Sequence, residues 1–289
     1  MIKGEEMMTT KMRMLWLGAL LFISLVLVVF PAIENNTANA QDDEWAELQK
    51  DFFGDKEILP TNGDIEIITP AAAHNAALIP VTVLFKAPII EKAKKLHLIL
   101  DENPAPLAAV FEFGEGFRNK INIGERTITT RLRAEYTSKV RAILETTDGK
   151  YYMSSSKVDF VSAGGCSAPM AGDLEFAVRN LGKIRISTRK EETNSQDWRE
   201  GTVMIRHPNL SGMQMDPKSG SFMPAWYVKQ IIIKQKQDLI FRVNAGISLS
   251  QNPHFRFTYP STISKDNLQV EVRDSKGNHF QKTHVVEGS

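Results

Sequence analysis

Apolar and polar residues alternate with a period of two along most of the chain after residue 60. The alternation is clear from Asp64 to Ile68 and again over residues 138–146. Such alternation is typical of half-buried β-strands, and the glycine of Asp148-Gly149 suits the tight turn of a hairpin. The first half of the chain therefore predicts strands over residues 64–68, 79–85, 96–100, 107–113, 127–134, 138–146 and 151–161.

The same alternation returns in the second half of the chain. It predicts strands over residues 183–187, 202–207, 227–234, 238–244, 254–259, 267–273 and 279–285. Short strands separated by Pro, Gly and Asn clusters are typical of antiparallel β-sandwiches. We therefore expect an all-β protein with two sandwich domains in tandem, over residues 41–162 and 173–289, joined by a flexible connector over residues 163–172.

Two segments of the second half do not follow the strand pattern. Residues 174–181 predict a short apolar helix that ends at Gly182. Residues 208–226 form a long loop with three methionines, one phenylalanine and one tryptophan. Loops of this length are uncommon in compact domains unless they have a function, and methionine serves both in cores and at interaction surfaces. The loop therefore either caps the core or offers a surface to a partner.

The N-terminus has the three parts of an export signal. Lys11 and Arg13 precede an apolar run over residues 15–30, and Ala38-Asn39-Ala40 supplies the small residues of a cleavage site. We therefore expect residues 1–40 to be a signal peptide that is removed during export. The alternative is an uncleaved anchor, although the run is shorter than the roughly 20 residues that a spanning helix needs.

The composition excludes several common classes of function. Lys and Arg number 35 against 34 Asp and Glu, so the net charge of +1 gives no reason to expect nucleic acid or an anionic membrane as a partner. None of the six histidines pairs at the spacing of a zinc protease, and no second cysteine exists for a thiolate site, so we expect no metal. The chain also lacks a complete dinucleotide fingerprint and a G-x-S-x-G hydrolase motif.

Cys166 is the only cysteine of the chain, so it forms no internal disulfide. It follows Gly164 and Gly165 and precedes Ser167-Ala168-Pro169. A lone cysteine is often a small buried residue, but these neighbours offer little side chain to pack around it and make the backbone permissive. We therefore expect a flexible arm that exposes a reactive thiol, with Gly164 and Gly165 supplying the flexibility.

Three arginines of the first half are candidates for recognising an anionic cargo or partner. Arg131 and Arg133 share one face if their strand keeps its period of two, and Arg141 lies on the next predicted strand. They form either a positive outer face that steers an anion or an ordinary solvated strand face. No lysine or arginine lies between residues 161 and 173, so we expect no local cation to lower the pKa of the thiol.

Several short segments of the chain follow the order of a known pair of subunits. In the first half these are residues 103–111 (NPAPLAAVF), 130–133 (TRLR), 140–142 (VRA), 147–153 (TDGKYYM) and 164–166 (GGC). They resemble SoxY, the sulfur-carrying subunit of the thiosulfate-oxidising Sox system. Residues 205–208 (IRHP) and 252–257 (NPHFRF), with the methionine-rich loop, resemble SoxZ. The whole is similar to a fused SoxYZ-like carrier of the type associated with quinoprotein dehydrogenases.

The resemblance implies a fold, a location and a role. Both halves would be immunoglobulin-like β-sandwiches, and the protein would be periplasmic. Cys166 would hold sulfur intermediates covalently while partner enzymes act on them, and these partners would be Sox-type periplasmic enzymes, c-type cytochromes or a quinoprotein dehydrogenase system. The protein would then be a carrier and not an enzyme, with no cofactor apart from the bound sulfur intermediate.

The chain departs from SoxY directly after the cysteine. SoxY ends with GGCGG, whereas Cys166 is followed by Ser167 and a second domain. A connector over residues 163–172 that is fixed at both ends projects roughly 15 Å, about half of its contour length at about 3.3 Å per residue. Two other functions stay open: an extracytoplasmic binding module without covalent cargo, and a thiol-dependent enzyme, for which glycine flanks are a poor platform.

Overall fold

The computed structural model describes residues 36–118, 124–160, 164–190, 198–260 and 266–286. The chain divides into two compact units between Asp51 and Phe52. The first unit holds most of helix α2 (Asn36–Phe53), and the described strands all belong to the second. Residues 1–35 of the predicted signal peptide lie outside the described residues, and the predicted cleavage position after Ala40 falls within α2. In the described part of the chain, no helix has the length and hydropathy to cross a membrane.

The second unit consists mainly of strands, which confirms the predicted all-β class. The first half contains β1 (Ile58–Pro60), β2 (Ile65–Ile68), β3 (Ala72–Ala73), β4 (Ile79–Phe85), β5 (Ala93–Leu100), β6 (Leu107–Phe113), β7 (Arg126–Leu132), β8 (Ser138–Thr146) and β9 (Tyr151–Phe160). The second half contains β10 (Ile184–Lys190), β11 (Trp198–Ile205), β12 (Val228–Gln235), β13 (Asp238–Ala245), β14 (His254–Pro260), β15 (Asp266–Asp274) and β16 (His279–Val286). Short helices α3 (Ile89–Lys92), α4 (Glu115–Arg118) and α5 (Leu174–Arg179) lie between strands.

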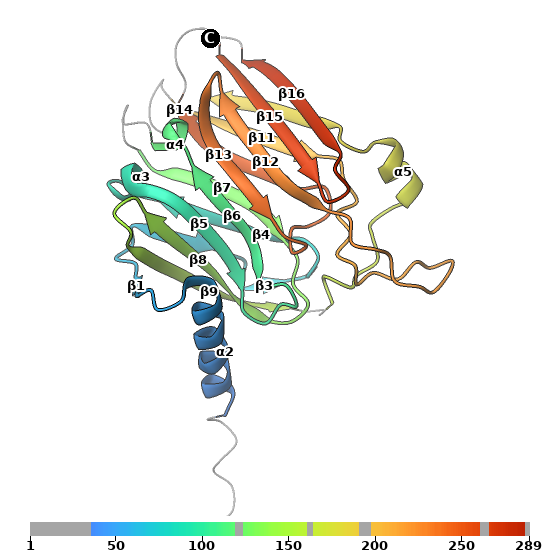
Figure 1. Ribbon diagram of the computed structural model, residues 1–289, viewed down its shortest axis with the longest axis horizontal. Helices are drawn as coiled ribbons and strands as arrows, with labels where there is room; N and C mark the ends of the chain where they lie inside the picture. The colour runs from blue at the N-terminus through green and yellow to red at the C-terminus, as the bar shows by residue number, and fades with distance from the viewer. Residues whose placement is uncertain (1–35, 119–123, 161–163, 191–197, 261–265, 287–289) are drawn as a thin grey trace, which may run out of the picture. The chain divides into compact units, whose positions relative to one another are not determined.

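The strands form two sheets, and each sheet contains strands from both halves of the chain (Figure 1). One sheet has the order β1-β9-β8-β5-β6-β13-β12-β15-β16, with β3 beside β9, and the other has the order β10-β11-β14-β7-β4-β2. The pairs are antiparallel except for β1 and β3, which run parallel to β9. The halves join where β6 pairs with β13 and where β7 pairs with β14. The two predicted sandwiches are thus continuous with each other through both sheets.

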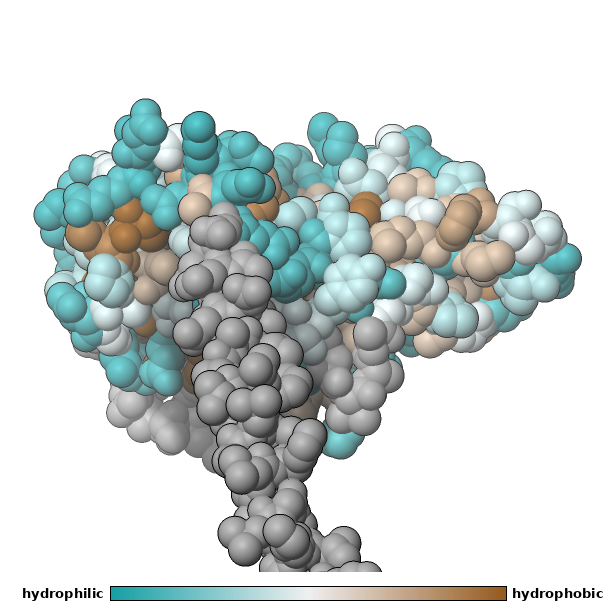
Figure 2. Space-filling view, turned by 90° about the horizontal axis from the view of Figure 1, so that it is seen from below, coloured by the Kyte–Doolittle hydropathy of each residue, from teal (hydrophilic) through white to brown (hydrophobic). Residues whose placement is uncertain are grey.

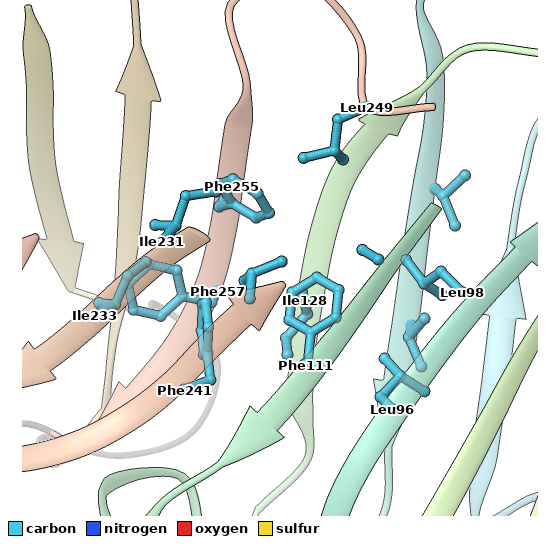
Figure 3. Close-up of a cluster of buried hydrophobic side chains, with 14 of the residues drawn as sticks. Leu96, Leu98, Phe111, Ile128, Ile231, Ile233, Phe241, Leu249, Phe255 and Phe257 are labelled. Carbon is cyan, nitrogen blue, oxygen red and sulfur yellow. The ribbon is translucent and has the colours of Figure 1, made fainter. Parts of the chain in front are cut away.

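The hydrophobic core crosses the junction between the halves. Phe111 of β6 packs edge-on against Phe241 of β13 and Phe255 of β14, with ring centroids 5.6 and 6.1 Å apart (Figure 3). The buried cluster extends from Ile65 in the first half to Val286 in the second. Burial of apolar surface is the main force that stabilises such a core. Sharing it fixes the two halves against each other, so a site built from both halves has a rigid frame.

The segment after the cysteine enters the predicted short helix. Asp173 caps α5, because its carboxylate accepts a hydrogen bond from the backbone N–H of Glu175 at 3.0 Å. The helix buries none of its residues: Phe176 is 56% exposed and Val178 is 45% exposed. The predicted helix is therefore present, but its apolar side chains face solvent. In the first half, helix α3 is a single turn, because β5 begins at Ala93.

The long methionine-rich loop over residues 208–226 has a packed base and an exposed tip. Leu210 and Trp226 pair at the base and are buried, whereas Met215 pairs with Phe222 at the tip and both side chains are exposed. Figure 2 shows apolar residues at both ends of the face it displays, one of them the end that carries this loop. The base of the loop therefore packs on the core, as the first interpretation predicts, and the exposed tip leaves a partner surface as a prediction.

Candidate functional site

Cys166 lies in a turn after β9, and its side chain is only 1% exposed. The expectation of an exposed thiol on a flexible arm is therefore wrong for this structure. The sequence argument failed because it considered only the neighbours of Cys166 in the chain, which are small. The groups that contact the thiol belong to residues 33 and 63 positions earlier in the sequence.

Gly164 and Gly165 hold the turn close to the first half of the chain. Their N–H groups donate to the carbonyl oxygens of Glu135 and Ala134, each at 2.8 Å. Gly164 has a φ of +90°, a conformation that side chains rarely adopt. A Cβ atom at Gly165 would collide with the carbonyl oxygens of Ala76 and Ala134. The glycines thus permit close backbone packing here, which corrects their predicted role as the flexible part of an arm.

The carboxylate of Glu135 holds the backbone on either side of the thiol. Its Oε2 atom accepts hydrogen bonds from the N–H groups of Cys166 at 2.9 Å and Ser167 at 3.1 Å. Its Oε1 atom accepts a hydrogen bond from the Ser167 hydroxyl at 2.8 Å. Hydrogen bonds to an ionised group are the stronger kind. We call these three contacts the Glu135 clamp, and they fix the turn that contains the cysteine.

The thiol lies against polar groups, of which the Asn103 side chain is the nearer. Cys166 Sγ lies 3.6 Å from Asn103 Oδ1 and 4.0 Å from the carbonyl oxygen of Arg133. Asn103 Oδ1 also accepts the N–H of Glu135 at 2.8 Å, and its Nδ2 donates to Ser248 Oγ at 2.8 Å. Because Ser248 belongs to the second half, both halves hold the asparagine that accepts the hydrogen bond of the thiol.

Burial raises the pKa of the Cys166 thiol to about 11. Burial is the largest cause because it disfavours the charged thiolate, and the carboxylate of Glu135 adds to it. The Arg133 guanidinium and the Asn103 hydrogen bond act in the opposite direction and do not offset burial. The thiolate is the nucleophilic form of cysteine. The thiol is therefore protected in this conformation and reacts only after the turn opens.

The second half of the chain holds the far side of the turn. The Ser211 hydroxyl, at the base of the long loop, donates to the Cys166 carbonyl oxygen at 2.6 Å. The backbone of Ala171 exchanges two hydrogen bonds with the side-chain amide of Gln251, at 2.9 and 3.0 Å. The turn and the residues that follow it, 164–171, are called the thiol segment below. The thiol segment is fixed to both halves of the chain. The side chain of Glu135 holds its beginning, and that of Gln251 holds its end.

The predicted positive face of three arginines does not form. Arg131 is exposed, but β7 ends at Leu132, so the alternation stops and Arg133 is buried. The Arg133 guanidinium donates to the carbonyl oxygens of Leu249 at 2.9 Å and Asn209 at 2.6 Å, and burial lowers its pKa to about 10. Arg141 is buried in a bidentate ion pair with Asp101 at 2.7 to 2.9 Å. Only Arg131 of the three therefore faces solvent.

A second buried carboxylate, that of Asp274, holds the base of the long loop. Its Oδ2 atom accepts hydrogen bonds from Trp226 Nε1 at 2.8 Å and Asn278 Nδ2 at 2.8 Å, and it lies 3.4 Å from His207 Nε2. Its Oδ1 atom accepts the N–H groups of Lys276 and Asn278, each at 2.9 Å. Burial lowers the pKa of His207 to about 4, although Asp274 favours its protonation. We call this group the Asp274 network.

Sequence reasoning identified some residues of the site and missed others. Asn103 and Arg133 lie in segments that carry the family resemblance, but no local pattern places them at the thiol. Glu135 and Ser211 were missed, because nothing in the local pattern marks a side chain that bonds the backbone of a distant turn. Within the described ranges, no group of three or more His, Cys, Asp or Glu side chains comes together as a metal site would require.

Comparison with known proteins provides an independent assignment. Residues 49–166 match the family described as sulfur oxidation protein SoxY, and residues 186–285 match sulphur oxidation protein SoxZ. Among solved structures, the sulfur carrier protein SoxY from Chlorobium limicola f thiosulfatophilum is 22% identical over 41% of this chain and 93% of that chain, with a TM-score of 0.32. No curated protein matches the chain. The first family match ends at Cys166 itself.

Proposed function

Because the chain belongs to the SoxY and SoxZ families, joined in one SoxYZ-like polypeptide, we propose that it is an exported carrier that holds sulfur intermediates covalently on Cys166. It works in the periplasm and presents the bound group to partner enzymes of a sulfur-oxidation pathway. The expected signal peptide over residues 1–40 supports this location.

The observation that carries the proposal is how the thiol segment is held. Cys166 is the one apolar side chain of the segment that is buried, while Ser167, Pro169 and Ala171 are exposed. The segment is otherwise fixed by hydrogen bonds to Glu135, Ser211 and Gln251. Such contacts break locally without loss of the hydrophobic core. The thiol is thus stored in a protected state and becomes available by a local opening, which suits a carrier.

Loading of the thiol then defines the class of partner. Joining the thiol to thiosulfate forms Cys–S–S–SO₃⁻ and releases one proton and two electrons. The electrons need an acceptor, so this route requires a redox partner, for which a c-type cytochrome is a suitable class. Removal of the bound sulfur in later steps belongs to other partner enzymes. A quinoprotein dehydrogenase system is the alternative pathway for the same carrier.

The two tethers of the thiol segment limit its reach. Gly165 is bonded to Ala134 at one end, and Ala171 is bonded to Gln251 at the other. A partner therefore reaches Cys166 at the surface of the carrier, after the segment lifts, rather than by receiving a free chain end in a deep tunnel.

The surroundings of the thiol favour a carrier over a thiol-dependent enzyme. An enzyme nucleophile needs a base within hydrogen-bonding distance. Among the described residues, the contacts of Cys166 Sγ are the Asn103 amide oxygen and the Arg133 carbonyl oxygen. The carboxylate of Glu135 contacts backbone N–H groups and the Ser167 hydroxyl. In a binding module without covalent cargo, this protected thiol would have no function.

Covalent loading tests the proposal directly. Tetrathionate carries its own leaving group, because a thiolate that attacks it keeps –S–SO₃⁻ and releases thiosulfate. We expect intact mass spectrometry to find this single adduct on the chain and none on Cys166→Ser. Serine can still donate to Asn103 Oδ1, so the variant should fold. In cells, Cys166→Ser should abolish sulfur oxidation that depends on this protein, and full activity of that variant would overturn the proposal.

A further inference from the structure

A pocket of about 390 Å³ lies beside the thiol segment. Gly165 and Met170 of the segment line one side of it, and residues of both halves of the chain line the rest. This volume is within the range of small-molecule pockets, roughly 300 to 1,000 Å³. Cys166 does not line the pocket but directly follows Gly165, which does. The pocket is therefore a space that a group on the thiol enters once the side chain turns away from Asn103.

The charged residues that line the pocket all have the same sign. They are Arg131 and Arg133 from the first half and Arg206 from the second, and no aspartate or glutamate lines the pocket. The chain as a whole carries nearly equal numbers of acidic and basic residues. A wall with three arginines and no carboxylate therefore departs from the composition of the protein and favours an anionic ligand.

The guanidinium groups of these arginines have donors to spare. Arg131 and Arg206 are exposed, and neither side chain has a hydrogen bond or ion pair among the described residues. Arg133 is 3% exposed, and its Nε and Nη2 atoms donate to backbone carbonyls. Its Nη1 group has no partner among the residues that the structure describes. A buried guanidinium with unused donors at the wall of a pocket is a strong attraction for an anion.

Three amide side chains in the pocket are oriented in the same sense. The side-chain oxygen of Asn252 accepts the N–H of His207 at 3.2 Å, and that of Gln214 accepts the N–H of Ser211 at 2.9 Å. The side-chain oxygen of Asn75 accepts the N–H of Ala77 at 2.9 Å. Because a backbone N–H can only donate, these bonds fix the oxygen of each amide and leave its NH₂ group as the free end. The pocket thus presents donors from its amides as well as from its arginines.

We propose that this pocket binds a sulfur oxyanion, and that its occupant in the working carrier is the anionic end of the group attached to Cys166. This second statement rests on the proposed function. The pocket would hold the –SO₃⁻ end between Arg131, Arg133 and Arg206 by hydrogen bonds and charge, without any covalent step. Its use would be to keep a loaded thiol docked on the carrier until a partner competes for the anion.

Free thiosulfate binding tests the pocket without the thiol chemistry. Titration calorimetry on Cys166→Ser should detect thiosulfate binding that weakens as ionic strength rises. The double variant R131Q/R206Q, in the same background, should bind about tenfold more weakly or worse, because each charge-assisted bond contributes more than a neutral one and 1.4 kcal/mol is tenfold. The matched control is Arg179→Gln on α5, an exposed arginine outside the pocket, which should bind as Cys166→Ser does.

Three further outcomes test whether the pocket is the binding site and whether the group attached to Cys166 occupies it. If R131Q/R206Q and R179Q bind thiosulfate equally, the pocket is not the binding site and the proposal is overturned, whatever Cys166 carries. The chain loaded with –S–SO₃⁻ from tetrathionate should bind free thiosulfate at least about tenfold more weakly than the unloaded chain, because the attached group occupies the pocket. Equal binding by loaded and unloaded chains would overturn the docking of the attached group. Failure of tetrathionate to load Cys166 would instead count against the proposed function alone.

Discussion

Glu135 and Asp274 are two buried carboxylates that organise turns in very different ways. Asp274 lies at the end of β15 and collects donors from the indole of Trp226, the side chain of Asn278 and two backbone N–H groups. Glu135 collects three donors, and all belong to Cys166 and Ser167. Asp274 connects several parts of the second half of the chain, whereas Glu135 holds only the turn that contains Cys166.

This difference between the two carboxylates indicates which region of the molecule opens locally. Loss of the Asp274 network would leave the indole N–H of Trp226 without its partner and disturb the base of the long loop. Loss of the Glu135 clamp would free the N–H groups of Cys166 and Ser167, and water satisfies them once the turn opens. Local openings of this kind have free energies well below that of global unfolding. We therefore expect the Asp274 network to set stability and the Glu135 clamp to set access to the thiol.

Asp274→Ala should have the largest effect on stability. The substitution leaves the buried indole N–H of Trp226 and two part-buried backbone N–H groups without their acceptor. Each buried donor that loses its acceptor costs about 1 to 3 kcal/mol. Chemical denaturation should show this as a lower midpoint with an unchanged slope. Asp274→Asn keeps an acceptor oxygen and should lose less. If Asp274→Ala unfolds at the same denaturant concentration as the parent, the network does not have this role.

Acid should weaken the region around Asp274 through the protonation of His207. His207 has a pKa of about 4 in the folded chain, so the unfolded chain takes up its proton at a higher pH. Its stabilising contribution is complete above about pH 6.5 and is lost as pH falls toward 4, for a total on the order of 3 kcal/mol. Unfolding measured from pH 7 to pH 4 should show this loss.

A second buried histidine must be separated from His207 in that measurement. His97 also has a pKa lowered to about 4 by burial, and its Nε2 atom has no hydrogen-bond partner within the described ranges. The variant His97→Leu removes its contribution to the pH dependence. His254 also has a pKa lowered by burial, so the histidine contribution that remains in His97→Leu/His254→Leu belongs to His207. A stability that is constant from pH 7 to pH 4 in His97→Leu would contradict the assignment.

The strands of this fold were predictable from the sequence, but their pairing across the halves was not. The alternation over residues 138–146 gave β8 with its observed bounds. The junctions of β6 with β13 and β7 with β14 have no local signal, because any strand with one apolar face can pair at an open edge. Helix α2 was not predicted either, since the N-terminal residues were interpreted as an export signal up to Ala40.

The site was predictable as far as its cysteine and no further. The composition around Cys166 indicates a permissive backbone, but not that Gly165 packs against the carbonyls of Ala76 and Ala134. Small residues are used both where a chain is mobile and where two backbones approach closely. Only the positions of the distant partners, Asn103 and Glu135 above all, distinguish these two cases.

Weakening the Glu135 clamp should expose the thiol with little loss of global stability. Glu135→Gln retains one acceptor oxygen and loses the charge, and Glu135→Ala loses all three bonds. Bonds to charged groups are worth about 1.5 to 3 kcal/mol each, and water replaces part of that. Alkylation of Cys166 by iodoacetamide at pH 8 should therefore be roughly tenfold faster in Glu135→Gln and faster still in Glu135→Ala, by 1.4 kcal/mol per tenfold.

The Asp274 network supplies the control for this measurement. Asp274→Asn should change global unfolding more than alkylation, and Glu135→Gln should do the reverse. If both substitutions accelerate alkylation in proportion to their loss of global stability, the thiol is reached by global unfolding. The clamp would then not be a separate opening unit.

Ser211→Ala should have the smallest effect, and it tests whether the second half of the chain takes part in closing the thiol. The hydroxyl of Ser211 donates to the Cys166 carbonyl oxygen at 2.6 Å, from a loop that otherwise packs on the second half. Removing one neutral hydrogen bond costs about 1 kcal/mol, so alkylation should be roughly fivefold faster. Ser221→Ala at the exposed tip of the same loop is the matched control and should react as the parent does.

The double variant Glu135→Gln/Ser211→Ala should show the product of the single effects if the two halves hold the turn independently. Alkylation of Ser211→Ala at the parent rate would mean that the first half alone keeps the thiol closed.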